Sequence, residues 1–235
     1  DTATLSPKGP LSVARRYPAA TGNQSFGYFG AGASLTSIDR IDYSNDTATA
    51  SPKGPLSVAR YGGGATGNAS FGYFGGGSPG PTSSVDRIDY SNDTATAAAK
   101  GPLSAAFPYI AATGNSSFGY FGAGSGPSST VDRIDYSNDT ETASAKGPLS
   151  FARNYSTATS SRSNAIPTVN IVNYAAGTLG TPNTGYFAGG RTPGYASSID
   201  RIDYSNDTAI ALSKGQLTQS KKVGGGVSSD SFAYF

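Results

Sequence analysis

The stretch from Ser70 to Asp93 reads SFGYFGGGSPGPTSSVDRIDYSND. It holds two short segments rich in aromatic and β-branched residues, separated by glycines and prolines. Segments of this kind favour β-strands, and Gly-Pro clusters at this density leave no room for a helix of three turns. The short polar side chains of Ser91, Asn92 and Asp93 bond readily to their own backbone and favour a turn. The stretch therefore predicts strands at 70–75 and 84–90, with a turn after the second.

Close variants of this stretch recur along the whole chain at intervals of about 45 to 47 residues. Copies of KGPLS begin at Lys8, Lys53, Lys100 and Lys146, copies of FGYFG at Phe26, Phe71 and Phe118, and copies of DRIDYSND at Asp39, Asp86, Asp132 and Asp200. Cutting before each Asp-Thr pair gives repeat units 1–45, 46–92, 93–138, 139–206 and 207–235. A period of this length is typical of propeller blades or of long helical repeats, and the frequent glycines and prolines favour blades.

The second unit predicts four antiparallel strands. They lie near 63–68, at 70–75, at 84–90 and at 47–51, the last with its counterpart at 94–97 in the next unit. Side chains alternate between the two faces of a strand, so in FGYF Phe71 and Tyr73 face one side and Gly72 and Phe74 face the other. Because neither side is charged, we expect neighbouring blades to cover both faces of the sheet. We therefore expect an all-β fold, a single β-propeller domain of four-stranded antiparallel blades. Five blades are expected, with six or seven in a longer native chain as the alternative.

The last units depart from the regular pattern. The fourth is about 21 residues longer than the second, and we interpret 162–184 as an insertion on one blade, with two blades fused by a deletion as the alternative. Segment 1–15 supplies the outer part of a blade, and 223–235 supplies inner strands. We predict that these two segments share one blade and close the ring. Because the chain begins within a repeat phrase, we expect a processed product or a segment of a longer protein.

Composition excludes several classes of function. Charged residues make up 14% of the chain and the net charge is +2, which does not support a polybasic nucleic-acid surface. No run approaches 18 apolar residues, so we expect no membrane insertion. The absence of His and Cys excludes imidazole bases, thiolate nucleophiles and Cys/His metal sites. We expect no cofactor.

The order of motifs resembles the kelch-type β-propeller repeat. In that family a hydrophobic strand ends in a double glycine, a V-E-x-Y-D strand follows, and a P-x-x-R segment leads into the next blade. The matching segments here are 75–77, 85–89 and 55–60, although the family's Trp is absent from every unit. The amino-acid sequence of the repeats is also similar to that of repeat arrays in virion and tail-associated proteins of marine tailed bacteriophages. That resemblance implies an extracellular or virion-borne structural or adhesive module.

The repeated carboxylates offer two candidate sites. Asp86, Asp89, Asn92 and Asp93 supply the oxygen ligands that calcium prefers, but they lack the spacing of a calcium loop, and turn formation explains Asn92 and Asp93. Asp86 and Asp89 could act as a general acid and base. They recur in four units, however, and repeated residues normally serve the scaffold. Asp86 beside Arg87 also offers charge pairing between blades. We expect neither a metal site nor catalysis.

Four tyrosines recur at the end of the predicted third strand: Tyr43, Tyr90, Tyr136 and Tyr204. A tyrosine has an apolar ring face and a polar tip, so these residues are candidates for stacking on sugars. The preferred interpretation is that they pack between blades.

The expected function is that of a non-catalytic structural or adhesive propeller module of an extracellular or virion assembly, which binds proteins or a host surface. Its partners would be other proteins of the assembly or surface glycans. Loops 31–37, 78–83, 125–129 and 191–196 differ most between units, and contacts with a partner could be tuned there. A multivalent carbohydrate-binding lectin is the alternative.

Overall fold

The computed structural model describes residues 5–80, 82–126, 128–160, 184–190, 195–221, 227–228 and 233–234. Four antiparallel sheets of four strands each follow one another along the chain. They are β1 (Ala19–Gly22), β2 (Phe26–Gly30), β3 (Ile38–Asp42) and β4 (Ser51–Lys53); β5 (Gly64–Gly67), β6 (Phe71–Gly75), β7 (Val85–Asp89) and β8 (Ala98–Lys100); β9 (Ala111–Gly114), β10 (Phe118–Gly122), β11 (Val131–Asp135) and β12 (Ser144–Ala145); and β13 (Thr157–Ser160), β14 (Thr184–Ala188), β15 (Ala196–Asp203) and β16 (Leu212–Lys221).

Helical structure among the described residues is confined to three 3-10 turns, which follow the third strands. They are η1 (Tyr43–Asn45), η2 (Tyr90–Asn92) and η3 (Tyr136–Asn138). None of the helices that the structure describes is long and apolar enough to span a membrane. A short hairpin of β17 (Val227–Ser228) and β18 (Ala233–Tyr234) follows the fourth sheet.

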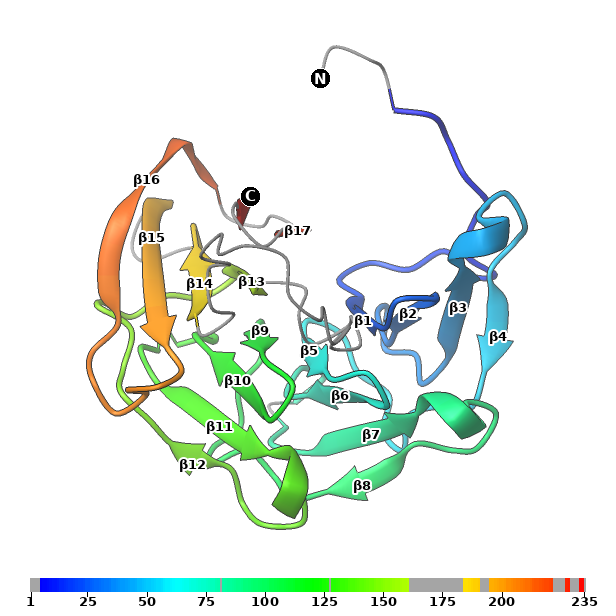
Figure 1. The fold of residues 1–235 in the computed structure, drawn as a ribbon, viewed down its shortest axis with the longest axis horizontal. Coiled ribbons are helices and arrows are strands. Elements are labelled where there is room, and N and C mark those ends of the chain that lie inside the picture. Colours follow the sequence, from blue (N-terminus) through cyan, green and yellow to red (C-terminus); the bar gives the residue numbers. More distant parts are fainter. Residues whose placement is uncertain are drawn as a thin grey trace, which may run out of the picture.

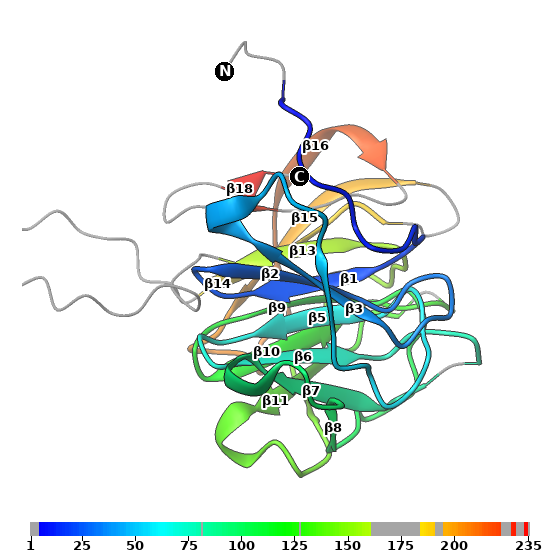
Figure 2. The same ribbon diagram turned by 90° about the vertical axis from the view of Figure 1, so that its right-hand side faces the viewer.

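The four sheets are arranged as blades around an axis, with their first strands at the centre (Figure 1). β1 contacts β5, β5 contacts β9, and β9 contacts β13, while β17 lies beside β13. Seen from the side, successive blades lie next to one another (Figure 2). The expected all-β propeller of four-stranded antiparallel blades is therefore confirmed.

The number of blades beyond these four stays a prediction. Most of the expected insertion at 162–184 lies outside the described residues, as do parts of both segments that are expected to close the ring. The five-blade count and the pairing of 1–15 with 223–235 are therefore untested by the structure.

The sequence misplaced the outer strand of each blade. The predicted segment 94–97 is a turn, and the strand begins at Ala98. The backbone N–H of Ala97 donates to the carbonyl of Pro55, in the segment that connects β4 to β5, at 2.8 Å. Ala97 therefore bonds outside the sheet, and pairing with β7 starts one residue later, at Ala98. In the first blade Pro52 lies inside β4, where an edge strand tolerates the missing donor.

Aromatic side chains of one blade pack against glycines of the blade before it. A Cβ added to Gly75 would lie 2.8 Å from the Phe121 ring, so the ring occupies the space that any larger residue would need. Gly30 faces Phe74 in the same way, and Gly122 faces Phe187. The FGYFG segments of the second and third blades thus each supply a ring for the preceding blade and a glycine for the following one. This explains why the second strand is apolar on both faces.

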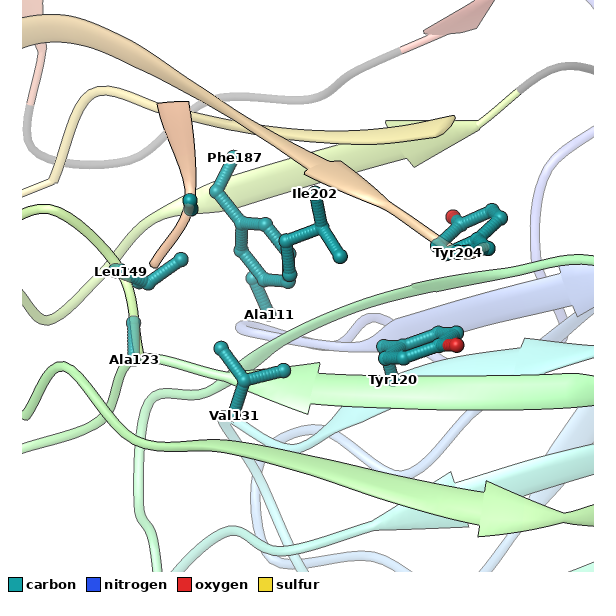
Figure 3. Packing of buried hydrophobic residues seen from close by; sticks show 9 residues of the cluster. Ala111, Tyr120, Ala123, Val131, Leu149, Phe187, Ile202 and Tyr204 are labelled. Atoms are coloured by element: carbon teal, nitrogen blue, oxygen red, sulfur yellow. The ribbon is translucent and has the colours of Figure 1, made fainter. Parts of the chain in front are cut away.

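Tyrosines form a second contact between blades. Tyr73 of β6 stacks on Tyr136 of the next blade with ring centroids 4.7 Å apart. The Tyr136 hydroxyl lies 3.2 Å from the Thr66 hydroxyl, which belongs to the preceding blade's inner strand. Tyr28 and Tyr90 repeat the stack at the first boundary, and Tyr120 and Tyr204 at the third, which Figure 3 shows with the surrounding apolar side chains.

A buried carboxylate completes each boundary. Asp139 accepts hydrogen bonds from the Tyr73 hydroxyl at 2.8 Å and from Arg87 at 2.7 Å, and Lys100 lies 3.1 Å away. All three donors belong to the preceding blade. We call Tyr73, Arg87 and Lys100, together with Asp139 and Tyr136, a blade joint. In the other two joints the carboxylate has equivalent partners: Asp93 contacts Tyr28, Arg40 and Lys53, and Asp207 contacts Tyr120, Arg133 and Lys146.

Replacing Asp139 with Asn should lower the free energy of unfolding by about 2 kcal/mol, because the change leaves two partly buried cations, Arg87 and Lys100, without a counter-charge. Urea unfolding at neutral pH measures the loss. Glu141→Gln is the matched control, since this exposed carboxylate lies two residues away and should change stability by less than about 0.5 kcal/mol. Equal effects of the two substitutions would contradict the role given to the joint.

The joints should also make the protein unfold in alkali. Burial is the largest cause that raises the pKa of Tyr73 and of Tyr136 above the ordinary value of 10.0. A pKa raised in the folded state stabilises the fold below about pH 10, and this contribution is lost as the pH rises through the folded value.

We therefore expect the joint tyrosines to ionise together with the loss of the β-sheet circular-dichroism signal. Tyrosinate absorbance followed across the titration checks this. In the denatured chain all tyrosines should titrate at the ordinary value. Ionisation of every tyrosine near that value with the fold intact would show that the stacks are open to water.

Candidate functional site

The third-strand tyrosines lie mostly inside the scaffold. Tyr90, Tyr136 and Tyr204 each stack on a tyrosine of the preceding blade, and their hydroxyls lie 3.0–3.2 Å from threonine hydroxyls of that blade's inner strand. Tyr43 belongs to the first blade and is 49% exposed. The arrangement favours the packing interpretation for the three joint tyrosines, since one face of each ring is covered.

The carboxylates considered for metal binding or catalysis do not meet at one point. Asp86 is fully buried and contacts Arg60 at 2.9 Å. Asp89 caps the turn that follows its strand, and hydrogen bonds from Ser91 lower the pKa of its carboxyl. Asp93 is the acceptor of a blade joint. Neighbours in sequence thus serve three separate structural roles, and the described residues contain no group of three or more Asp, Glu, His or Cys placed to hold a metal.

The charged residues of DRID have different partners, and Asp86 forms a buried ion pair with Arg60. Arg60 lies in the segment that leads into the second blade, and it also donates to the carbonyl oxygens of Gly76 and Ser84. Equivalent pairs join Arg15 to Asp39 and Arg153 to Asp200. Arg87, the neighbour of Asp86, points to Asp139 on the next blade. Arg87 therefore makes the expected charge pair between blades, whereas Asp86 binds an arginine of the lead-in segment.

The third blade lacks the arginine of this pair. Phe107 stands at the position of Arg60, four residues before the first strand. Asp132 stays fully buried and accepts hydrogen bonds from the Ser104 backbone and hydroxyl, both at 2.7 Å. Burial raises the pKa of Asp132 above its usual value, and the Ser104 hydrogen bonds oppose the rise only in part.

In the first three blades, the two faces of the disc differ in how much the repeats vary. Turns between first and second strands, and between third and fourth strands, lie on one face because the strands alternate in direction. On this constant face, Asn23, Asn68 and Asn115 make the same turn by accepting two backbone N–H bonds each. The opposite, variable face carries the loops between second and third strands and the segments that lead into each first strand.

Variable loops and lead-in segments are tied together across blades. The N–H of Gly32 donates to the carbonyl of Arg60, the N–H of Gly77 to that of Phe107, and the N–H of Gly124 to that of Arg153, at 2.8–3.0 Å. Each loop therefore rests on the next blade's lead-in segment. The side chains that differ between units are presented on a hydrogen-bonded backbone.

Four tyrosines from the lead-in segments gather on the variable face, next to the inner strands. The Tyr109 ring lies 5.9 Å from that of Tyr17, 6.0 Å from that of Tyr61 and 4.1 Å from that of Tyr155, between centroids. Tyr17 and Tyr61 are 6.3 Å apart. We call Tyr17, Tyr61, Tyr109 and Tyr155 the tyrosine cluster. Each comes from a different blade.

The cluster has a strained backbone. The residue two positions before each first strand has a left-handed φ: 55° at Tyr17, 64° at Gly62, 57° at Tyr109 and 52° at Tyr155. Glycine adopts this conformation freely, whereas for a tyrosine it costs about 1–2 kcal/mol. Backbone hydrogen bonds link these positions around the axis, from Gly62 to Tyr17, from Ile110 to Gly62 and from Tyr155 to Tyr109. The scaffold thus holds three tyrosines where glycine would fit more easily.

A cavity of about 130 Å³ opens beside the cluster. Tyr17, Tyr109 and Tyr155 line it together with Pro18, Ile110 and Ser156, and its described lining residues are uncharged. These tyrosines are not among the site residues predicted from the sequence. Their signal was a tyrosine within a few residues of every first strand, in the differing phrases ARRYP, ARYGG, AAFPYI and ARNYS.

Comparison with known proteins supports the fold and leaves the function open. No family model and no curated protein sequence matches the chain. Among solved structures, YjhT is similar with a TM-score of 0.66 and 12% identity, over 94% of this chain and 70% of that one. At this identity the likeness shows a shared propeller-like fold.

Removal of charge should destabilise the protein much more at Asp86 than at Asp132. Asp86→Asn leaves the buried Arg60 unpaired and should lower the free energy of unfolding by about 3 kcal/mol. Asp132→Asn should change it by less than about 1 kcal/mol at neutral pH, since the neutral side chain keeps acceptor capacity for Ser104.

Urea unfolding as a function of pH separates the two. The raised pKa of Asp132 favours its protonated form in the folded state, so its contribution to stability is present below the unfolded value of 3.8 and is lost above it. The parent chain should therefore lose stability between acid and neutral pH as Asp132 ionises, and Asp132→Asn should not show this loss. A loss as large as that of Asp86→Asn would mean that Asp132 has a cationic partner.

Proposed function

We propose that this chain is a non-catalytic adhesive and structural propeller module that binds its partner through the variable face. The supporting observation is the division of the repeats. In the first three blades the constant-face turns repeat almost unchanged, and variation is concentrated in the loops and lead-in segments of the opposite face, whereas the fourth blade has a longer segment between β13 and β14; the blade joints keep the same residue types at all three boundaries. A scaffold alone needs no such asymmetry, because both faces serve the fold equally.

The charged residues support a non-catalytic role. The carboxylates of DRID and SND are bound to arginines, lysines, serines and tyrosines that hold the blades together. A general acid or base needs a group that is within reach of a substrate. Asp86 and Asp139 are buried inside the scaffold instead.

The setting in which the module acts rests on resemblance. The kelch-type order of motifs and the similarity to repeat arrays of marine bacteriophage particles support a place in an extracellular or virion assembly, with a host surface as the target. The alternative, a lectin, is favoured by the tyrosines of the variable face, which offer aromatic rings and hydroxyls at one point of the disc.

A cell-binding assay with charge-matched variants tests the proposal. Fluorescently labelled chain is titrated onto a panel of marine bacteria. Ser125→Lys with Tyr195→Lys adds two charges to exposed positions of the variable face, and Thr96→Lys with Thr140→Lys adds two to the constant face. We expect saturable binding that the variable-face pair weakens about ten-fold or more, whereas the constant-face pair leaves it unchanged.

Two results would contradict the proposal. Equal loss of binding in both variants would show that charge acts through the molecule as a whole. Release of soluble sugars or peptides from the cells by the purified chain would show that it is an enzyme.

A further inference from the structure

We propose that the tyrosine cluster binds one neutral sugar ring of a larger glycan. This inference rests on the proposed function, because it assigns a ligand class to the variable face. It differs from a lectin with equivalent pockets on every blade, since the cluster forms a single site from four blades.

The first reason is the convergence of the rings. Tyr17, Tyr61, Tyr109 and Tyr155 are about 44 to 48 residues apart in sequence, and the propeller brings the Tyr109 ring centroid within 4.1–6.0 Å of the other three. Tyr17 keeps 41% of its surface exposed. A sugar ring has an apolar face that stacks on such an aromatic surface and hydroxyls around its edge that need polar partners.

The second reason is the strain. Gly62 shows that this backbone position accepts glycine, yet the other three blades place a tyrosine there in a left-handed conformation. Strained residues persist where the surroundings hold them, and they cluster at binding sites. Packing does not use the whole of the Tyr17 side chain, because 41% of its surface stays exposed.

The third reason is the polarity of the cavity. Its described lining residues carry no charge, so they offer a phosphate, a carboxylate or an ammonium group no counter-charge. Burial, and hydrogen bonding with Tyr61 and Tyr155, raise the pKa of the Tyr109 hydroxyl, which keeps it protonated. Neutral phenol groups both donate and accept hydrogen bonds, as sugar hydroxyls require.

Size and shape limit the ligand to one compact ring. The cavity volume of about 130 Å³ is well below the roughly 300–1,000 Å³ typical of sites that enclose a whole small molecule. One ring of a glycan can insert while the rest lies across the variable face. The rings of Tyr17 and Tyr109 meet edge to face at 82°, so they do not form parallel ridges. A proline-rich peptide would instead need aromatic ridges aligned along a groove.

Binding of simple glycosides to the whole chain tests the site. The probes are the methyl glycosides of glucose, galactose, mannose and N-acetylglucosamine, with glucuronic acid and a proline-rich peptide as contrasting ligands. Saturation-transfer NMR followed by calorimetry measures binding to the parent chain and to Tyr17→Gly. We expect at least one neutral glycoside to bind and Tyr17→Gly to weaken it about ten-fold or more.

The substitution to glycine also separates binding from folding. Because glycine relieves the left-handed strain, the free energy of unfolding of Tyr17→Gly should stay within about 1 kcal/mol of the parent value. Ile210→Ala, an exposed apolar residue on the constant face, is the control and should bind like the parent chain. Tyr43→Ala, on the first blade, should also leave glycoside binding unchanged.

Several outcomes would overturn the inference. They are absence of binding by every neutral glycoside, stronger binding of glucuronic acid or of the peptide, and loss of binding in Tyr43→Ala but not in Tyr17→Gly. If cell binding depends on the variable face while no neutral glycoside binds, the sugar site is wrong and the proposed function stands. If glycosides bind at Tyr17 but cells are bound equally through both faces, the proposed function is wrong and the site stands.

Discussion

A buried carboxylate shared between two blades is the interaction on which the fold depends. Asp139 lies between β11 and β12 of the third blade, and its donors Tyr73, Arg87 and Lys100 come from three different strands of the second blade. A charge with so little contact with water is stable only while these donors are in place. The contact therefore fixes the position of each blade relative to its neighbour. It also explains why the chain repeats short phrases: each supplies one group to the joint, the Tyr of FGYF, the Arg of DRID, the Lys of KGPLS and the final Asp of SND.

The joints leave the variable face free to differ. Aromatic rings, glycines and charges between the blades carry the packing, so loops between second and third strands need only rest their backbones on the next blade. Side chains on those loops can change from unit to unit while the disc stays intact. The tyrosine cluster is the point where all four described blades contribute to one feature. Tyr17, Tyr109 and Tyr155 have a left-handed φ, whereas the other described residues with a left-handed φ are glycine, alanine or serine.

Much of the architecture could be predicted from sequence, because the same strand and turn patterns recur in every repeat unit and support one another. The all-β class, the four-stranded blade and the two central strands of each blade follow from FGYF, the glycine cluster and DRIDY. The outer strand was placed about four residues too early, because Ala97 bonds to Pro55 in the segment between β4 and β5, a contact between distant residues that no local pattern shows. Asp93 looked like a turn residue for the same reason. The lead-in tyrosines were missed because their position in the phrase shifts by one residue between Tyr61 and Tyr109 relative to the first strand. Only the folded ring brings them together.

A double-mutant cycle across one joint measures whether neighbouring blades are held by these contacts. Arg87→Met, Asp139→Asn and the double variant are compared by urea unfolding, with Arg40→Met and Asp139→Asn as a pair from different joints. Coupling of about 1–3 kcal/mol between Arg87 and Asp139, with none between Arg40 and Asp139, is the result that a joint predicts. Coupling below about 0.3 kcal/mol in both pairs would contradict it, since the carboxylate and its arginine would then act independently.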